Sequence, residues 1–570
     1  MTPTSSPSAR ILPSLLLLVF LPWQALAARL YVLPEPDRPG SHLPPAPYLS
    51  LSEALEAARP GDTVIVLPGI LRESVTVAIR GEPGRPVVIR GLPGAILESP
   101  DPGRSLSAFD VVAPTAWVRI EGFEIRGDFD EAVFVRSGTH DVVLSDLRVH
   151  GNRKGIWIAG ATHVRVRNSL VHDNSGSGIR VFGTADSIFI ENSESRDNRD
   201  GEGCRGDADG LAVEEEVGAV TVDGFRASGN SEDGLDLKSP VPVLSRVESL
   251  SNGCTGIKLW QGGTVQNAAV FGHRIGVSNS SGVLLLANVT LQENLIGLRA
   301  GENTVVTIVN SIVSGPGKAL ILGKSATFLE DSNIFFRPTH GPLLEIHDED
   351  SRVRFSFGSL RDQGWNTFRG ENSGTLLVDP RLSDLGEPSP RSPAVDSGNP
   401  SLAPAYDLRG TLRPLGTGPD RGAIETGVRE VLLSVDRFRA TAGSAAGDRF
   451  RLRGRSTAIL PSPNALDFRL ESGNRRVVET TFYEDDILTR RWGFVAFRSD
   501  GGRRVLLRVR QKASGTEVRV VGRGVELWRL GDDVRVDFGS GDVRVRGEHS
   551  LAVRALRGGA LRIATEKRLW

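Results

Sequence analysis

The chain of 570 residues is too long for one ordinary hydrophobic core and indicates two or three domains or a solenoid. Its formal net charge of −1 gives no electrostatic basis for binding nucleic acid or an anionic membrane surface. Glycine is abundant, at 65 residues, and aromatic residues make up only 6%, which is typical of many short strands joined by turns.

The first 27 residues have the pattern of a secretory signal peptide. Arg10 precedes an apolar run over residues 11–21, and Ala25-Leu26-Ala27 forms an A-x-A cleavage site. This run is too short to span a membrane, and no later stretch is long and apolar enough to do so. We therefore expect an exported protein, secreted or periplasmic, without a transmembrane segment.

One amphipathic helix is predicted over residues 50–58, with Ser52 as its capping residue. Gly/Pro turns then separate short strands, which we expect at 63–67, 74–79 and 86–89. A single helix ahead of a run of short strands is typical of the N-terminal cap of a solenoid.

A repeat of about 22 residues begins near residue 115 and decides the predicted fold. A polar asparagine recurs at Asn152, Asn174, Asn198, Asn230, Asn252 and Asn294. A glycine followed by an apolar residue recurs at Gly155, Gly178, Gly210, Gly234, Gly256, Gly276 and Gly297. This period, with short strands and no helical segments, predicts a parallel β-helix. Leucine-rich repeats share the period but need an L-x-x-L-x-L phrase, which is absent.

One repeat contains an insertion of roughly ten residues, at 200–209, and insertions in solenoids often lie on the binding face. Cys204 lies in this insertion, and Cys254 is the only other cysteine. In an oxidising compartment the two can form a disulfide. Sequence does not give the distance between them, so a bridge and two free thiols both remain open.

The C-terminal part of the chain divides in two. Residues 392–398, 407–410 and 420–425 resemble the closing segment of many secreted bacterial β-helices, so the solenoid is predicted to span 28–427. Residues 428–570 alternate apolar and charged residues between Gly-rich turns. They predict a β-sandwich-like domain of antiparallel strands with one solvated face and carry no visible catalytic motif.

Equivalent positions of successive turns stack about 4.8 Å apart in a parallel β-helix. The residues before the repeat glycines place Asp209 next to Asp233. The second residues after those glycines are flanked by inward apolar residues and therefore point outward. They place Asp236 next to Lys258, with Arg180 two turns before Asp236.

With Glu232 beside them, these acids crowd several carboxylates together, which requires a cation or a proton. Oxygen ligands without histidine or free thiolate favour a hard cation, and an exported, loop-rich chain favours Ca²⁺ over Mg²⁺. The candidate ligands are Asp209, Glu232, Asp233 and Asp236. Three readings remain open: a catalytic Ca²⁺ site, a structural Ca²⁺ that holds the turns together, and solvated acids without a metal.

Lys258 is the candidate general base, because a nearby cation lowers the pKa of a lysine and favours its neutral amine. An outward lysine beside Asp236 can equally be a surface ion pair of little energetic weight. Lysine is scarce in this chain, and this one lies next to the predicted cation.

The phrases at residues 207–212, 230–237 and 256–259 occur in the order and with the separations of polysaccharide lyase family 9. Residues 140–300 thus resemble these pectate-lyase-like enzymes. The resemblance implies a right-handed parallel β-helix, a Ca²⁺ site formed by the four acids, and Lys258 as the base. Glu232 departs from the aspartate usual there, and Trp260-Gln261 precede the Gly-Gly that usually follows the lysine phrase directly.

Together these features predict cleavage of a polyuronate, such as pectate, by β-elimination. Lys258 would remove the C5 proton while Ca²⁺ binds the adjacent carboxylate. Arg180, Arg205 or Arg299 can hold further uronate carboxylates. We expect a monomer that acts on an acidic polysaccharide and binds no nucleic acid.

Two alternatives to the lyase remain. The first is a non-catalytic secreted β-helix that binds glycan or a cell surface and uses Ca²⁺ for stability. The second is a glycoside hydrolase with paired carboxylates, although the Gly-His-Gly and Arg-Ile-Lys phrases usual in such hydrolases are absent.

Overall fold

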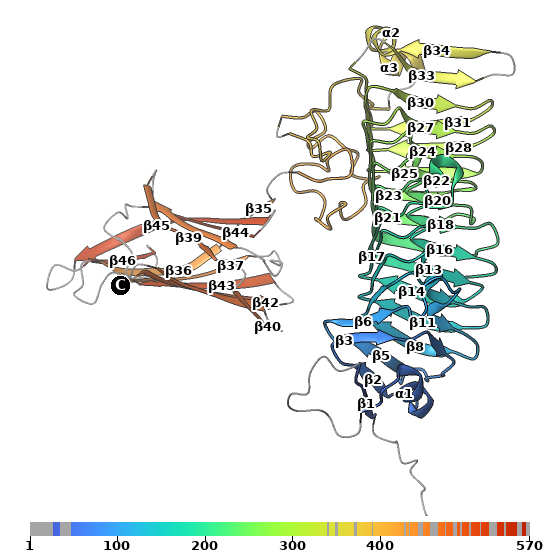
Figure 1. The fold of residues 1–570 in the computed structure, drawn as a ribbon. Coiled ribbons are helices and arrows are strands. Elements are labelled where there is room, and N and C mark those ends of the chain that lie inside the picture. Colours follow the sequence, from blue (N-terminus) through green and yellow to red (C-terminus); the bar gives the residue numbers. More distant parts are fainter. Residues whose placement is uncertain are drawn as a thin grey trace, which may run out of the picture.

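The repeat region folds as a parallel β-helix in the computed structural model (Figure 1). The structure describes residues 27–34, 47–338, 341–347, 351–369, 373–389 and 391–426, together with the backbone of the strands beyond residue 428. The predicted signal peptide, apart from Ala27, lies outside these residues. Within these ranges, no helix combines the length and hydropathy that a membrane crossing requires.

One face of the β-helix is a 13-stranded sheet. Each repeat glycine lies within one of its strands or directly before one. Neighbouring strands of this sheet are parallel, except for the last pair. In chain order they are β4 (Val75–Val77), β7 (Ser107–Val111), β10 (Glu131–Val135), β13 (Lys154–Ala159), β16 (Ile179–Phe182), β18 (Leu211–Val213), β20 (Leu235–Leu237), β22 (Thr255–Leu259), β24 (Ile275–Asn279), β27 (Ile296–Ala300), β30 (Lys318–Leu322), β33 (Pro342–His347) and β34 (Arg352–Ser356).

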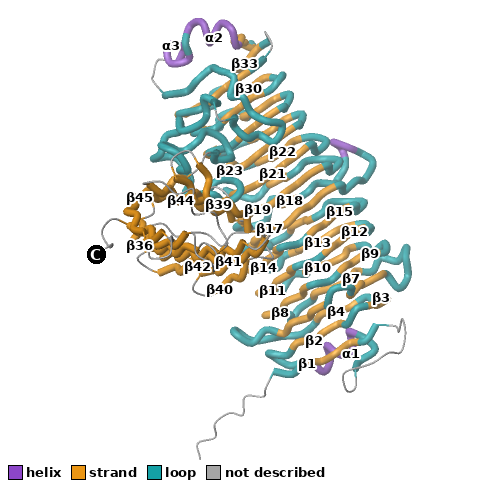
Figure 2. Tube along the Cα trace, turned by 90° about the vertical axis from the view of Figure 1, so that its left-hand side faces the viewer, coloured by secondary structure: helices purple, strands orange, loops and turns teal. Residues whose placement is uncertain are grey.

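The remainder of each turn forms a 21-stranded sheet, and Figure 2 shows the strands stacked as rungs with loops at the corners. Its strands are β1 (Arg29–Val32), β2 (Thr63–Val66), β3 (Gly69–Arg72), β5 (Val87–Gly91), β6 (Ala95–Glu98), β8 (Ala116–Glu121), β9 (Glu124–Arg126), β11 (His140–Ser145), β12 (Arg148–His150), β14 (Thr162–Arg167), β15 (Leu170–His172), β17 (Ile188–Arg196), β19 (Val220–Ser228), β21 (Val243–Leu250), β23 (Gly262–Phe271), β25 (Val283–Ala287), β26 (Thr290–Gln292), β28 (Val305–Val309), β29 (Ile312–Ser314), β31 (Thr327–Asp331) and β32 (Ile334–Phe336).

The repeat glycines are required because the backbone of the next turn lies against them. A Cβ atom on Gly234 would stand 2.2 Å from the Ser249 hydroxyl oxygen and 2.5 Å from the Gly256 carbonyl oxygen. At Gly210 it would stand 2.5 Å from the Gly234 carbonyl oxygen. The apolar residues that follow these glycines point inward and stack turn on turn as the core.

The repeated asparagines form a buried ladder along one corner. The Asn198 backbone N–H donates to Asn230 Oδ1 at 3.2 Å, and the Asn230 N–H donates to Asn252 Oδ1 at 3.0 Å. His273 takes the next position, and its backbone N–H donates to Asn294 Oδ1 at 2.9 Å. The side chains therefore satisfy backbone donors that the turns leave without a ladder partner.

The N-terminal end of the stack carries the predicted helix, α1 (Leu51–Ala57). Its capping residue is Ser50, whose hydroxyl accepts from the Glu53 backbone N–H at 3.3 Å. The prediction of Ser52 as the cap was wrong, because the helix begins at Leu51 and Ser52 lies within its first turn. A short 3₁₀ helix, η1 (Gly203–Arg205), lies in the insertion.

The C-terminal end of the stack is covered by α2 (Phe357–Gln363) and α3 (Trp365–Arg369), which the sequence did not predict (Figure 1). The predicted closing segment packs along the side of the stack instead. Leu408 and Ile424 form an apolar cluster with Ala269, and Asn288 Nδ2 donates to the Asp420 carbonyl oxygen at 2.9 Å.

Beyond residue 428 the chain forms a 12-stranded sheet of antiparallel neighbours, apart from the parallel pair β35–β45. The predicted antiparallel strands are thus confirmed at the level of the fold. The strands are β35 (Arg429–Leu432), β36 (Ser434–Ala442), β37 (Arg449–Ser456), β38 (Leu466–Ser472), β39 (Arg475–Phe482), β40 (Ile487–Arg490), β41 (Gly493–Asp500), β42 (Arg503–Lys512), β43 (Gly515–Arg523), β44 (Asp533–Ser540), β45 (Val543–Ala555) and β46 (Leu561–Thr565).

Candidate active site

Asp209 and Asp233 each precede a repeat glycine and stack one above the other. The Asp233 backbone N–H donates to Asp209 Oδ1 at 2.9 Å, and the Thr255 N–H donates to Asp233 Oδ1 at 2.7 Å. Both aspartates are buried. Each carboxylate therefore uses one oxygen to connect successive turns.

The outward column predicted from the repeat is present in the 13-stranded sheet. Arg180 pairs with Ala212, Ala212 with Asp236, and Asp236 with Lys258. The column continues from Lys258 through Ser278 to Arg299. Strand alternation thus brings an acid and a lysine side by side on the outer face.

Lys258 lies between two carboxylates. Its Nζ atom is 3.0 Å from Asp233 Oδ2 and 3.2 Å from Asp236 Oδ2. Burial opposes the charged form of Lys258, but the two carboxylates outweigh burial and raise its pKa above the usual value. With no other cation present, Lys258 is therefore an ammonium ion that neutralises part of the acidic cluster.

Carboxylate oxygens of Asp209, Glu232 and Asp233 lie within 4.8 Å of one another. Burial, reinforced by the neighbouring carboxylates, raises the pKa of Asp209 well above its usual value. Burial and the charge of Asp233 likewise raise the pKa of Glu232 to about 7. Three oxygen ligands whose negative charge is under-compensated are the donor set that a hard divalent cation prefers, so these residues fit Ca²⁺.

Asp236 lies beside this group but uses its oxygens differently. The Trp260 indole N–H donates to Asp236 Oδ1 at 2.7 Å, and Lys258 donates to Oδ2. Burial raises the pKa of Asp236, although the Lys258 charge opposes this effect. The structure therefore brings together three of the four predicted ligands and connects the fourth to the predicted base.

The three predicted substrate-binding arginines have different surroundings. Arg180 already forms ion pairs with Asp207 and with Glu214. Arg205 is exposed on the insertion, and Arg299 is exposed two turns beyond Lys258. Arg205 and Arg299 are thus more accessible than Arg180 to a carboxylate from solution.

The insertion is tied to the acidic cluster by a disulfide between Cys204 and Cys254, whose Cα atoms are 5.7 Å apart. The Cys254 backbone N–H donates to the Glu232 carbonyl oxygen at 3.0 Å. On the other side of the insertion, Ser231 donates to Asp200 Oδ1 at 3.0 Å. The insertion is therefore fixed at the rim of the cluster, next to Glu232.

Trp260, Lys238 and Glu214 also belong to this face, and sequence reasoning did not include them. Each lies two positions after a member of the outward column, so the alternation that found Asp236 and Lys258 could also have found these residues. Lys238 Nζ is 2.6 Å from Glu214 Oε2. Together with Arg180, this pair continues the charged network toward the N-terminal turns.

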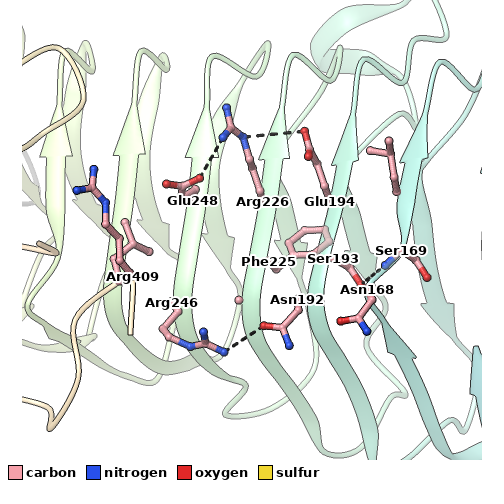
Figure 3. A pocket seen from close by; sticks show the side chains of 13 residues that line it. Asn168, Ser169, Asn192, Ser193, Glu194, Phe225, Arg226, Arg246, Glu248 and Arg409 are labelled. Atoms are coloured by element: carbon pink, nitrogen blue, oxygen red, sulfur yellow. Dashed lines mark hydrogen bonds and ion pairs between the residues drawn. The ribbon is translucent and has the colours of Figure 1, made fainter. Parts of the chain in front are cut away.

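A groove of 630 Å³ lies on the 21-stranded sheet, next to the closing segment (Figure 3). None of the predicted site residues lines it. Arg226 lies between Glu194 and Glu248, with nitrogen–oxygen distances of 4.0 and 3.4 Å. These three side chains thus pair with one another within the groove, and the predicted site residues lie on the 13-stranded face instead.

Comparison with known proteins shows the same kind of β-helix. Residues 30–311 match the family described as "Pel9A-like, right handed beta helix region". No curated protein matches the sequence.

Three solved structures are among those that match the chain. A pectate lyase Pel9A structure has 20% identity and a TM-score of 0.42, and the match covers 71% of this chain and 97% of that one. A rhamnogalacturonan lyase has 14% identity and a TM-score of 0.37, over 53% and 87% of the two chains. An alginate lyase from Paenibacillus sp. str. FPU-7 has 15% identity and a TM-score of 0.33, over 49% and 96%.

Proposed function

We propose that this protein, whose residues 30–311 match the Pel9A-like right-handed β-helix family, is a secreted, Ca²⁺-dependent polysaccharide lyase that cleaves a polyuronate such as pectate by β-elimination. The observation that carries the proposal is the position of Lys258. Its amine lies on the outer face, within 3.2 Å of two carboxylates of the preceding turn and next to three oxygen ligands that fit a divalent cation.

Asp209, Glu232 and Asp233 would hold the cation, and a cation there would supply a Lewis acid beside the sugar carboxylate that makes the adjacent C5 proton more acidic. The amine of Lys258 takes that proton. The electrons of the C5–H bond form a C4–C5 double bond as the C4–O bond breaks, and the leaving oxygen takes a proton from solvent. Asp236, which is not among the three cation ligands, then accepts from the ammonium form of Lys258.

This role requires Lys258 to lose its proton first. In the free protein the charges of Asp233 and Asp236 hold it as an ammonium ion. A cation held by Asp209, Glu232 and Asp233 would offset the charge of Asp233 and weaken this stabilisation, which would favour the neutral base. The ion pair in the structure thus represents the resting form of the proposed enzyme.

The exposed guanidinium groups of Arg299 and Arg205 are the candidates for holding carboxylates of neighbouring uronate residues. Arg180 contributes indirectly, because its ion pair with Glu214 fixes the orientation of both side chains on the same face. The substrate of this proposal is therefore an acidic polymer lying along the 13-stranded sheet.

The test is a product assay on a panel of polyuronates, including polygalacturonate and alginate, with Ca²⁺ or with a chelator. We expect unsaturated oligosaccharides from one polymer, and no product with the chelator. Lys258→Ala should lower kcat by at least about 100-fold. Lys318→Ala is the matched control, since Lys318 is also ion-paired on this sheet, 2.7 Å from Glu345, but far along the stack.

Activity that survives Lys258→Ala would remove Lys258 as the base. A chelator that lowers the melting temperature, while no polymer yields product, would instead indicate a non-catalytic β-helix with a structural cation. Reducing ends without unsaturation would indicate hydrolysis.

A further inference from the structure

Trp260 lies on the outer face immediately beside Lys258. It directly follows β22, and 37% of its surface is exposed, so part of the indole ring is accessible to a ligand. Its indole N–H donates to Asp236 Oδ1 at 2.7 Å, which fixes the orientation of the ring. The Lys258 Nζ atom lies 5.2 Å from the ring centroid.

Lys238 occupies the same position in the preceding turn, because Leu237 pairs with Leu259 in the register of β20 and β22. Its Nζ atom is 5.9 Å from the centroid of the Trp260 ring. The same Nζ atom forms an ion pair with Glu214, at 2.6 Å. An aromatic face and an ammonium group thus lie next to each other, within one turn of the candidate base.

We propose that Trp260 and Lys238 form a sugar-binding subsite that holds a uronic acid residue adjacent to the one that is cleaved. The C–H face of a pyranose ring is apolar and slightly positive, and it stacks on the electron-rich face of an indole. The ammonium group of Lys238 donates to the carboxylate of the same sugar residue. This subsite rests on the proposed lyase function and names how the same face would recognise an acidic sugar.

Trp260 has a second role in this arrangement. Its N–H holds Asp236 Oδ1, which leaves Oδ2 for Lys258 at 3.2 Å. A sugar residue stacked on the ring therefore contacts the side chain that positions Asp236 against the candidate base. The ring face and the N–H group can be separated experimentally, because phenylalanine keeps the first and lacks the second.

The experiment measures binding by calorimetry in the presence of Ca²⁺, with galacturonate and alginate oligosaccharides as acidic probes and a cello-oligosaccharide as the neutral probe. Binding is measured in a Lys258→Ala background, so that the probe is not cleaved. KM and kcat are measured with Lys258 present. The variants are Trp260→Ala, Trp260→Phe and Lys238→Ala. The control is Leu329→Ala, which removes an exposed side chain from the 21-stranded sheet.

We expect Trp260→Ala to weaken binding of the acidic oligosaccharide about tenfold and to raise KM, while Trp260→Phe stays within about threefold of the parent. Lys238→Ala should weaken the binding of the acidic oligosaccharides. It should leave the affinity for the neutral cello-oligosaccharide unchanged. Equal loss in Trp260→Phe and Trp260→Ala would overturn the stacking role, because it would mean that only the bond to Asp236 matters.

Oligosaccharide binding that is the same in Trp260→Ala as in the parent overturns the subsite and leaves the lyase proposal intact. Failure of the parent itself to bind any acidic probe overturns the proposed function, and the subsite with it. Melting temperatures of all variants are compared in parallel, so that a loss of folding is recognised as such.

Discussion

His273 interrupts the asparagine ladder, and the structure predicts that this single side chain makes the β-helix sensitive to mild acid. Its Nδ1 atom lies 3.2 Å from Asn294 Oδ1, which can only accept, so Nδ1 carries the proton. Its Nε2 atom then accepts from Asn252 Nδ2, at 3.2 Å. A proton on Nε2 would face the Asn252 donor, and burial lowers the pKa of His273 to about 4, against a usual value of 6.5.

The direction in which stability changes with pH depends on whether the unfolded or the folded chain binds the proton at the higher pH. Between pH 6.5 and pH 4 the unfolded chain binds a proton that the folded chain does not, so stability is complete above pH 6.5 and falls as the pH drops toward 4. Each pKa unit corresponds to about 1.4 kcal/mol, so the loss at pH 5 is about 2 kcal/mol. The full loss, below pH 4, is about 3 kcal/mol.

The test compares the wild-type protein with His273→Asn, which restores the ladder residue and cannot titrate. Urea denaturation at pH 7 and pH 5 gives the change in stability. Hydrogen exchange over residues 262–300 shows whether the change is local, because the turns of a solenoid contact mainly their neighbours. We expect His273→Asn to lose about 2 kcal/mol less than the wild type between the two pH values. The control is His163→Asn, at an exposed histidine, which should behave as the wild type. An equal loss in His273→Asn and wild type would refute the reasoning.

Three further perturbations test the site and its support. Replacing both Cys204 and Cys254 by serine should lower the free energy of unfolding by about 3–4 kcal/mol, because the bridge spans 50 residues; reductant should have the same effect on the wild type and none on the variant. Gly234→Ala should destabilise by more than about 3 kcal/mol, because the added Cβ has no space, whereas Gly358→Ala, where no atom lies within 4 Å of the added Cβ, should change stability by less than about 1 kcal/mol; similar effects of the two would contradict the packing argument. Glu232→Gln should weaken Ca²⁺ binding at least about tenfold by calorimetry, with the exposed Glu302→Gln as control; unchanged affinity would exclude Glu232 as a ligand.

The column of Asp236 and Lys258 could be predicted from the sequence because its cause is periodic. The repeat glycines mark equivalent positions, and strand alternation then decides which residues point outward. The structure has this register, from Arg180 through Asp236 and Lys258 to Arg299. A regular backbone thus allows a site to be predicted from residues that lie far apart in the chain.

The contacts within the site were beyond the sequence, because they depend on side-chain torsion angles and not on the repeat. The bond from Trp260 to Asp236 is one example, and it directs an Asp236 oxygen toward Lys258. The closing segment is another. Its packing against Ala269 and Asn288 joins positions more than 130 residues apart, for which a local pattern carries no signal.

Asp209 and Asp233 accept backbone N–H groups and also belong to the acidic cluster. Each accepts an N–H from the following turn, so each joins successive turns whether or not it also binds a cation. Acids at these two positions therefore have a structural role that does not depend on any reaction. Lys258 and Trp260 carry no such backbone duty through their side chains. In the proposed enzyme they are therefore the side chains whose replacement separates activity from folding.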